Sequence, residues 1–346
     1  MIIDKNIQLS DFTTFRTGGT ADFFCRVSTV EDLKIVRDFI QKNNILFFVL
    51  GGGSNVLISD EGFRGLVIKN EIKKELVCEA GEVTMNSTVL VSAGSGNDWD
   101  GFVGETISRG WFGLENLSHI PGTVGAAPVQ NVGAYGVEAG SLVEWVEIFD
   151  METGEIKKIS AQECGFGYRD SIFKRSQNKK LIITQVCFRL SLKPDVHIEY
   201  KDLTEYFTAK NITDITPVQV RAAIIEIRTK KLPDWKIMGT AGSFFKNCFI
   251  TKEKYESLKE QYPGIPGFTG ADGLVKVPLA WVLDHVCNLK GYRHEGVGVY
   301  ENQSLVLVNY AMKNASEVRE LASLIVMKVK EKTGIEIEPE VEYVGF

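Results

Sequence analysis

The spacing of apolar residues predicts a helix followed by a Gly-rich loop near the start of the chain. From residue 28, apolar positions recur with helical period at Val30, Leu33, Val36, Phe39 and Ile40. Ser28 and Glu31 have the spacing of a capping box, which predicts that the helix starts at Ser28. Two apolar runs, 45–50 and 56–59, flank the sequence GGGSN and are typical of buried strands. The loop therefore joins two strands, whereas a Rossmann fingerprint places its glycines between a strand and a helix.

The rest of the chain mixes strand and helix patterns without regular repetition. The predicted order is strand 88–94, helix 98–110, strands 142–150 and 181–190, a break at 193–195, helices 215–233, 277–289 and 314–334, and strand 335–344. Because the strands and helices do not alternate as βαβ units, the pattern predicts an α+β fold.

Length and charge restrict the class of protein. With 346 residues, of which 44% are hydrophobic and 24% charged, the chain has the composition of a folded protein of two or three domains. A net charge of -6 at pH 7 disfavours nucleic-acid binding, because contact with a phosphate backbone depends on clustered lysine and arginine. The charge still allows a local cationic site for a small anionic substrate.

Neither the cysteines nor the apolar segments indicate a metal site or a membrane anchor. The six cysteines are widely spaced and form no CxxC pair, so we expect reduced thiols. The first twenty residues lack the apolar stretch of a secretory signal, and no run of about 18 apolar residues occurs. These observations predict a cytoplasmic protein without a metal and without membrane contact.

Two loops rich in small residues are candidates for ligand binding. The glycines of GGGSN, at 51–55, could aim several backbone N–H groups at one phosphate, although a tight turn explains this loop equally well. The second loop, SHIPGTVGAAPVQNVGAYG at 118–136, is nearly free of charge. Its small residues would let a flat ligand approach the backbone; the alternative is a buried loop between packed elements. Two such loops in one chain favour ligand binding.

Seven short motifs follow one another along nearly the whole chain: TTFRTGG, LGGGSNVLIS, IPGTVGAAPVQNVGAYG, FGYRDS, KLPDW, GSFFKN and IEPEV. In sequence and order they resemble the signatures of the UDP-N-acetylenolpyruvoylglucosamine reductase family. The resemblance implies a two-lobed FAD-binding domain of the PCMH (vanillyl-alcohol-oxidase-like) type over about 17–193, with lobes at 1–70 and 71–193. An α+β substrate-binding domain with the catalytic terminal strand is expected at 194–346.

The resemblance assigns both Gly-rich loops to a noncovalently bound FAD. The implied contacts to FAD are Gly51, Gly52, Gly53, Ser54, Asn55, Ile120, Pro121, Gly122, Thr123, Gly125, Ala126, Gln130, Asn131, Gly133, Ala134 and Tyr135. None of the four histidines lies inside GGGSN, and we interpret His119, beside the second loop, as structural.

The resemblance also implies the catalytic residues. Arg169 in FGYRDS matches the arginine that polarises the substrate carboxylate, Ser243 in GSFFKN the serine that delivers a proton, and Glu340 in IEPEV the carboxylate that assists. Without the resemblance, Arg169 would be interpreted as a surface ion-pair partner and the other two as ordinary polar residues. Contacts to the nucleotide sugar or NADPH are implied for Tyr168, Tyr200, Arg228, Lys231, Asn247 and Gln303.

Two details refine the resemblance. Tyr200 and its surroundings resemble the longer family subtype, in which a tyrosine-bearing loop folds over the substrate. Cys248 stands after Asn247, where the family pattern has proline, which puts the local turn in doubt.

The implied activity is reduction of UDP-N-acetylglucosamine enolpyruvate to UDP-N-acetylmuramate by NADPH and FAD, in peptidoglycan precursor synthesis. We expect the enzyme to act as a monomer. Two other functions share part of the pattern: a flavin-dependent oxidase on the same scaffold, and a noncatalytic flavin- or nucleotide-sugar-binding protein. The motifs FGYRDS, GSFFKN and IEPEV disfavour the oxidase, and the presence of Arg169, Ser243 and Glu340 disfavours the noncatalytic protein.

Overall fold

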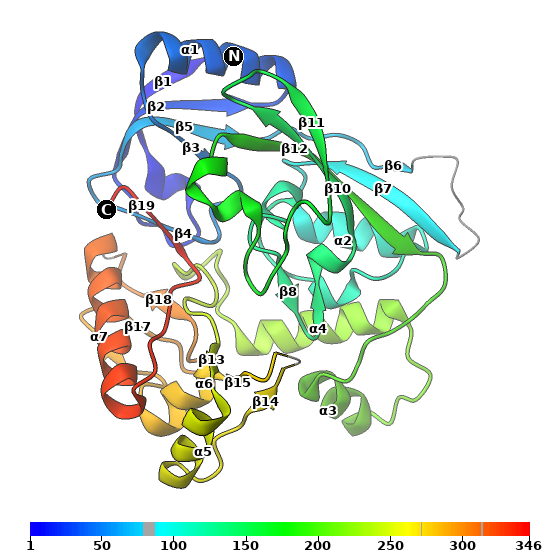
Figure 1. Cartoon of the computed structure of the whole chain (residues 1–346), viewed down its shortest axis with the longest axis vertical. Coiled ribbons are helices and arrows are strands. Elements are labelled where there is room, and N and C mark those ends of the chain that lie inside the picture. The colour runs from blue at the N-terminus through cyan, green and yellow to red at the C-terminus, as the bar shows by residue number, and fades with distance from the viewer. Residues whose placement is uncertain (79–86, 271, 313) are drawn as a thin grey trace. The chain divides into compact units, whose positions relative to one another are not determined.

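A computed structural model describes residues 1–78, 87–270, 272–312 and 314–346, and they form two compact units. Unit 1 comprises Met1–Ile7, Ala21–Gly52 and Arg64–Arg228, and unit 2 comprises Gln8–Thr20, Gly53–Phe63 and Thr229–Phe346. Each unit contains both helices and sheets, which confirms the predicted α+β class (Figure 1). Within the described ranges, every helix is too short or too polar to cross a membrane.

The first sheet of unit 1 has four strands. Their spatial order is β1 (Ile3–Gln8), β2 (Thr20–Val27), β5 (Phe63–Asn70) and β3 (Phe47–Leu50). Helix α1 (Val30–Asn43) covers one face of this sheet (Figure 1). Its buried Leu33 and Val36 pack in one core with Leu66 and Ile68 of β5. The helical period read from the sequence therefore marks the face that packs on the sheet.

The N-cap of α1 is Thr29, one residue after the Ser28 predicted from the sequence. The Thr29 side chain accepts a hydrogen bond from the Asp32 amide, and the Asp32 carboxylate accepts one from the Thr29 amide. The capping box is therefore Thr29–Asp32, and the predicted pair Ser28–Glu31 is wrong. Both pairs have the required spacing, so the pattern alone did not distinguish them.

The second sheet of unit 1 is antiparallel and has five strands. Their order is β11 (Ile156–Ser160), β10 (Val143–Asp150), β12 (Leu181–Ser191), β7 (Thr88–Gly94) and β6 (Val77–Cys78). Helix α2 (Trp99–Ser108) packs against it, with the Trp99 and Phe102 rings 5.9 and 5.1 Å from the Phe188 ring. Strands β7, β10 and β12 confirm the strands predicted at 88–94, 142–150 and 181–190, and α2 confirms the helix predicted at 98–110.

Among its described residues, unit 1 also contains a short hairpin and two α-helices. The hairpin pairs β8 (Gly133–Ala134) with β9 (Val137–Glu138), and the helices are α3 (Lys201–Ala209) and α4 (Pro217–Lys231), whose last residues lie in unit 2. Leu203 of α3 and Val220 of α4 share a small core. The Thr216 hydroxyl accepts from the Gln219 amide at 3.3 Å, which confirms the predicted helix start at Thr216 and Pro217.

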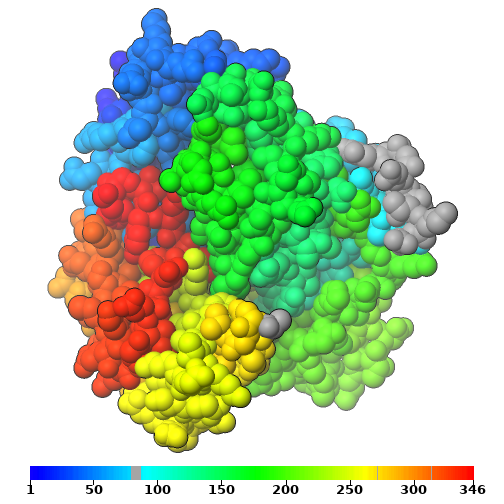
Figure 2. Space-filling view, viewed as in Figure 1, coloured from blue at the N-terminus to red at the C-terminus, as the bar shows by residue number. Residues whose placement is uncertain are grey.

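Unit 2 contains three small sheets around one core. The sheets are β13 (Cys248–Ile250), β15 (Val275–Val277) and β14 (Phe268–Thr269); β16 (Arg293–His294), β17 (Val297–Val299) and β18 (Leu307–Asn309); and the parallel pair β19 (Glu342–Val344) and β4 (Val56–Ile58). Its helices are α5 (Lys252–Gln261), α6 (Leu279–Trp281), a π-turn at Val282–Val286, and α7 (Ala315–Thr333). The α5 and α7 segments lie side by side on one face, where the Tyr262 hydroxyl donates to the Lys332 carbonyl at 2.9 Å (Figure 2).

The last two predicted segments, the helix over 314–334 and the strand over 335–344, have different outcomes. Helix α7 has Asn314 as N-cap, a capping box with Glu317 and a left-handed C-cap at Gly334, all of which confirm the prediction. The terminal strand covers only Glu342–Val344, so the prediction of a strand over 335–344 is wrong for its first seven residues. Its partner β4 is three residues long, and Pro339 has no N–H to donate to a ladder.

Candidate functional site

The two Gly-rich loops approach each other within unit 1. Gly51 and Gly52 follow strand β3, and GGGSN joins β3 to β4 as predicted. A Cβ atom on Gly52 would lie 2.6 Å from the Cα atom of Gly122, and one on Gly51 would lie 3.1 Å from Thr123 Oγ1. Because a side chain on Gly52 would overlap the Gly122 backbone, the two backbones form a close wall here. Such a wall fits a ligand that binds through backbone groups, as a dinucleotide diphosphate does.

Loop 118–136 is hydrogen-bonded to the segment that follows strand β7 of the second sheet. The amides of Val124 and Gly125 donate to the carbonyls of Asn97 and Ser95, each at 2.9 Å. A Cβ atom on Gly125 would lie 2.5 Å from Ser95 Cβ, so this glycine is also sterically required. On the other loop, the Lys69 ammonium donates to the Gly51 carbonyl, and burial lowers the pKa of Lys69. The sequence did not single out Lys69, because a lysine in a strand carries no local signal.

The second half of loop 118–136 is held by a buried amide. Asn131 is 1% exposed and has a left-handed backbone, with φ 45°. Its side chain donates to Glu138 Oε2 at 2.7 Å and to the Gly167 carbonyl at 2.9 Å, and accepts from the Gly140 amide at 2.8 Å. An amide with these partners fixes the conformation of the loop and connects it to the FGYRDS turn.

Arg169 of that turn contacts the same loop. Its Nη2 atom donates to the Gly133 carbonyl at 2.6 Å, and a Cβ atom on Gly133 would lie 2.8 Å from its Nη1 atom. Arg169 is left-handed, with φ 52°, and the ring of Tyr168 lies 5.6 Å from its guanidinium carbon. Backbone strain of this kind is more common at functional sites than elsewhere. The structure thus brings together predicted catalytic and cofactor-binding residues in unit 1.

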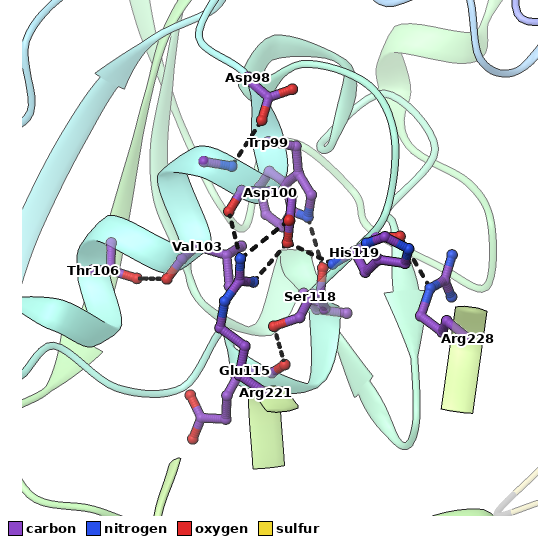
Figure 3. Close-up of polar contacts among 12 residues, drawn as sticks. Asp98, Trp99, Asp100, Val103, Thr106, Glu115, Ser118, His119, Arg221 and Arg228 are labelled. Carbon is purple, nitrogen blue, oxygen red and sulfur yellow. Dashed lines mark hydrogen bonds and ion pairs between the residues drawn. The ribbon is translucent and has the colours of Figure 1, made fainter. Parts of the chain in front are cut away.

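Three predicted ligand contacts form a second cluster in unit 1. The rings of Tyr135 and Tyr200 meet edge to face at 5.2 Å, and Arg228 hydrogen-bonds the Tyr135 side chain. Burial raises the pKa of Tyr135 to about 12, against the opposing effect of Arg228, so the phenol is neutral at physiological pH. Arg228 Nε also donates to the carbonyl of His119 at 3.1 Å (Figure 3). His119 is part of the cluster through its backbone.

The predicted catalytic residues of unit 2 lie on neighbouring segments. Ser243 forms an isolated antiparallel β-bridge with Val306. The carbonyl of the next residue, Phe244, accepts a hydrogen bond from the Glu340 amide at 2.8 Å. The Asn55 side chain donates to the Glu340 carbonyl at 3.2 Å. Segments that are distant in sequence therefore hold GSFFKN, IEPEV and the end of GGGSN together.

The TTFRTGG motif supports the same part of unit 2. The Thr14 amide donates to the Gly53 carbonyl at 3.0 Å, and its hydroxyl donates to the Thr240 carbonyl at 2.6 Å. Gly53 has φ 68°, and a Cβ atom there would lie 2.0 Å from the Phe12 carbonyl oxygen. The third glycine of GGGSN is therefore required by both its conformation and its packing.

The other predicted substrate contacts of unit 2 lie on different segments of the chain. Asn247 Oδ1 accepts from the Leu279 amide at 3.0 Å, and Gln303 Oε1 accepts from the Leu305 amide at 3.3 Å. Lys231 is the last residue of α4. Cys248 begins strand β13 opposite Val277, and burial raises the pKa of its thiol to about 12. None of the six cysteines takes part in a disulfide, and the reduced state of the thiols stays a prediction.

The remaining predicted FAD contacts lie along the same two loops, and the catalytic residues are divided between the units. Ile120, Pro121, Ala126, Gln130 and Ala134 belong to loop 118–136 of unit 1, and Ser54 follows Gly53 in unit 2. Arg169 belongs to unit 1, and Ser243 and Glu340 belong to unit 2.

Sequence reasoning missed an ion pair beside the loop, between Asp100 and Arg221 (Figure 3). The two residues lie on helices α2 and α4 and are 121 positions apart, so no spacing rule connects them.

Comparison with known proteins agrees with these features. The model of the UDP-N-acetylenolpyruvoylglucosamine reductase C-terminal domain matches residues 233–344, and an FAD-binding domain model matches residues 21–160. A UDP-N-acetylenolpyruvoylglucosamine reductase of Chromobacterium violaceum is 40% identical over 97% of both chains, and one of Porphyromonas gingivalis (strain W83) is 38% identical over 99% of this chain and all of its own. The crystal structure of a Thermus caldophilus enzyme of this name aligns with a TM-score of 0.66 and 26% identity over 99% of both chains.

These matches confirm the resemblance read from the seven motifs and the fold class of a PCMH-type FAD domain followed by an α+β domain. The exact boundaries predicted for the lobes and domains stay predictions. The chain belongs to the UDP-N-acetylenolpyruvoylglucosamine reductase family and is an FAD-dependent oxidoreductase.

Proposed function

We propose that this chain reduces UDP-N-acetylglucosamine enolpyruvate to UDP-N-acetylmuramate with NADPH, as a cytoplasmic step of peptidoglycan precursor synthesis. The observation that carries the proposal is the hydrogen bond of Arg169 to Gly133, inside the loop of predicted flavin contacts, at 2.6 Å. It supports the proposal because a carboxylate-binding arginine and the flavin must serve the same substrate. The names of full-length relatives support the same substrate.

The described residues fit a noncovalent FAD. Gly51, Gly52, Gly122 and Gly125 leave backbone without side chains where the two loops meet, and the FAD-binding domain model covers both loops. We propose that these loops hold the diphosphate and the isoalloxazine. The chemistry that FAD supplies when bound is hydride transfer from NADPH to the methylene carbon of the enolpyruvyl group.

The substrate must be activated, because an enol ether is electron-rich and resists hydride. Negative charge builds toward the carboxylate as the bond forms, so preorganised cations there lower the barrier. We assign this role to Arg169, whose planar fork suits a carboxylate better than lysine does. Its hydrogen bond to Gly133 and the adjacent Tyr168 ring restrict the guanidinium before substrate binds.

Protonation of the resulting carbon completes the reaction. We assign the proton donor to Ser243 and the assisting carboxylate to Glu340. The hydrogen bond between the Glu340 amide and the Phe244 carbonyl, at 2.8 Å, supports this assignment because it ties the two segments together. A serine hydroxyl is a weak acid in water, yet it suffices for a carbanion held in contact with it.

Binding of the nucleotide sugar needs local positive charge on a chain with a net charge of -6. We propose that Arg228 and Lys231 on α4 supply it and that Tyr200 closes over the substrate. Tyr168, Asn247 and Gln303 are the further proposed contacts. Tyr200 is 49% exposed beside Tyr135, which suits a side chain that acquires a partner on binding.

Anaerobic mixing of the purified protein with NADPH, and then with UDP-N-acetylglucosamine enolpyruvate, tests the proposal through flavin absorbance. We expect bleaching by NADPH and recovery when the substrate is added. Recovery with oxygen alone would instead identify an oxidase, and a protein without flavin absorbance would identify a noncatalytic binding protein.

We also propose that the enzyme is a monomer. Light scattering coupled to size exclusion measures its mass in solution.

A further inference from the structure

An ion pair in unit 1 joins helices α2 and α4. Arg221 Nη1 donates to Asp100 Oδ1 at 2.6 Å, and Nη2 donates to Asp100 Oδ2 at 3.1 Å. The two side chains are 20% and 30% exposed. A bidentate pair with this little exposure has a defined geometry, unlike most surface ion pairs.

The same carboxylate holds a turn of the loop. Asp100 Oδ1 accepts from the His119 amide at 2.5 Å, and His119 is left-handed, with φ 60°. Burial of Asp100 opposes its ionisation, but the hydrogen bonds from Arg221 and His119 outweigh it and lower the pKa of Asp100. The charged carboxylate therefore stabilises a backbone conformation that a non-glycine residue rarely adopts.

The carbonyl group of the same residue, His119, contacts Arg228. The His119 carbonyl accepts from Arg228 Nε at 3.1 Å (Figure 3). The Arg228 guanidinium also hydrogen-bonds Tyr135. Arg221 and Arg228 are seven residues apart, about two turns of α4, and so lie on one side of the helix. The series of contacts runs from Arg221 through Asp100 and His119 to Arg228.

We propose that Asp100 and Arg221 are positioning residues: through the His119 turn they orient the Arg228 guanidinium toward the anionic part of the nucleotide-sugar substrate. This inference rests on the proposed function, because it assumes that Arg228 contacts that substrate. Asp100 and Arg221 do not themselves touch the reacting atoms. Their removal should weaken substrate binding and leave hydride transfer from NADPH unchanged.

The variants are Asp100→Asn, Arg221→Met, the double variant and Arg221→Lys. Glu105→Gln is the matched control, because it breaks the exposed pair of Glu105 with Arg109 on the same helix. We expect Asp100→Asn and Arg221→Met each to raise KM for UDP-N-acetylglucosamine enolpyruvate about tenfold, equivalent to roughly 1.4 kcal/mol, with kcat within about twofold. The KM of the double variant should not exceed that of the single variant with the higher KM, because the two residues act through one contact. Arg221→Lys should have a lower KM than Arg221→Met.

A second measurement does not depend on turnover. The Nε–Hε NMR signal of Arg228, assigned by its loss in Arg228→Lys, should shift in Asp100→Asn and stay in place in Glu105→Gln. If the wild-type protein binds FAD but does not turn over the substrate, the proposed function fails while this signal still tests the positioning. An unchanged Arg228 signal in Asp100→Asn, or unchanged KM in both single variants, would overturn the inference.

Discussion

Single glycines in the candidate site differ in how strictly they are required. A Cβ atom on Gly52 would meet backbone at 2.6 Å, whereas one on Gly51 would meet the end of a threonine side chain at 3.1 Å. A side chain can rotate away, but two packed backbones must separate. The motif GGGSN therefore contains positions of unequal importance, which the letters of the sequence do not reveal.

We predict that Gly52→Ala forces the two loops apart and that Gly51→Ala is mild. Gly52→Ala should be purified with little FAD and be destabilised by about 1–3 kcal/mol, the usual effect of overpacking. The ratio of flavin to protein absorbance and the thermal midpoint measure both effects. Gly51→Ala is the matched control in the same loop, and equal flavin content in the two variants would contradict the steric argument.

We predict that Ser243→Ala retains its flavin and the rate of flavin reduction by NADPH but loses turnover. If Ser243 delivers the proton, kcat should fall by about 10²–10⁴-fold, the usual contribution of a general acid. Ser243→Cys should recover part of the rate, because a thiol also donates a proton. Stopped-flow absorbance separates the two half-reactions.

The control for this series is Ser323→Ala on helix α7, whose hydroxyl donates only within the helix, to the Arg319 carbonyl at 2.9 Å. Normal turnover of Ser243→Ala would show that Ser243 is not the proton donor.

At the residue scale, the sequence indicated the candidate site residues that lie in short motifs. It did not indicate residues whose role depends on contacts between distant parts of the chain. The Arg169–Gly133 contact was not foreseen, yet both residues lie in motifs that drew attention to them. Asp100 and Arg221 lie in no such motif. Their contact depends on how α2 and α4 pack, which local patterns do not encode.

At the scale of elements, the hydrophobic period predicted which segments are helices and strands better than it predicted where they end. The N-cap of helix α1 lies one residue later than expected because Ser28–Glu31 and Thr29–Asp32 share the same spacing. The terminal strand is shorter than expected because its partner β4 has only three residues. Ends depend on caps and partners, whereas interiors depend on the repeating apolar face.

The capping box of α1 predicts a pH dependence of local stability. Burial of Asp32 opposes its ionisation, but the hydrogen bonds from the Ser28 and Thr29 amides contribute to a larger opposing effect, and the pKa of Asp32 is lowered from its ordinary value. A depressed pKa means that the stabilisation is present above the unfolded value and is lost as pH falls through the folded value.

Asp32→Asn should therefore speed amide exchange in α1 at pH 7, by an amount equivalent to about 0.5 kcal/mol. At a pH below the lowered folded-state pKa of Asp32, the difference from wild type should vanish. Hydrogen exchange of the α1 amides at both pH values measures it. Glu31→Gln, one residue earlier, is the control, and the same effect in both variants would contradict the assigned capping box.

At the scale of the whole molecule, composition and pattern predicted the α+β class but not the way the chain divides. Unit 2 takes Gln8–Thr20 and Gly53–Phe63 from the N-terminal part of the chain. Phe15 and Leu57 from these segments are fully buried in one core with Phe244. A search for linkers treats domains as continuous segments, so it does not find a core assembled from three separate ones.

This division predicts how removal of FAD affects the two units. The loop 118–136 that we assign to FAD lies in unit 1, and Val124 and Gly125 donate the hydrogen bonds that tie it to Asn97 and Ser95. A ligand present at about 1,000 times its Kd stabilises the state that binds it by roughly 4.1 kcal/mol. Without FAD, opening of this loop should become easier by an amount of that order, up to the free energy of unfolding.

Helix α7 should respond differently, because Leu321 and Ile325 are fully buried in the core of unit 2 and lie outside the proposed FAD contacts. Hydrogen exchange with and without FAD should therefore show faster exchange over 118–136 and little change over Ala315–Thr333, and adding FAD back should restore protection. Equal protection of the loop in both forms would remove it from the FAD site. Equal loss of protection in α7 would instead mean that FAD stabilises the chain as one cooperative whole, because only global unfolding exposes amides in both units to the same extent.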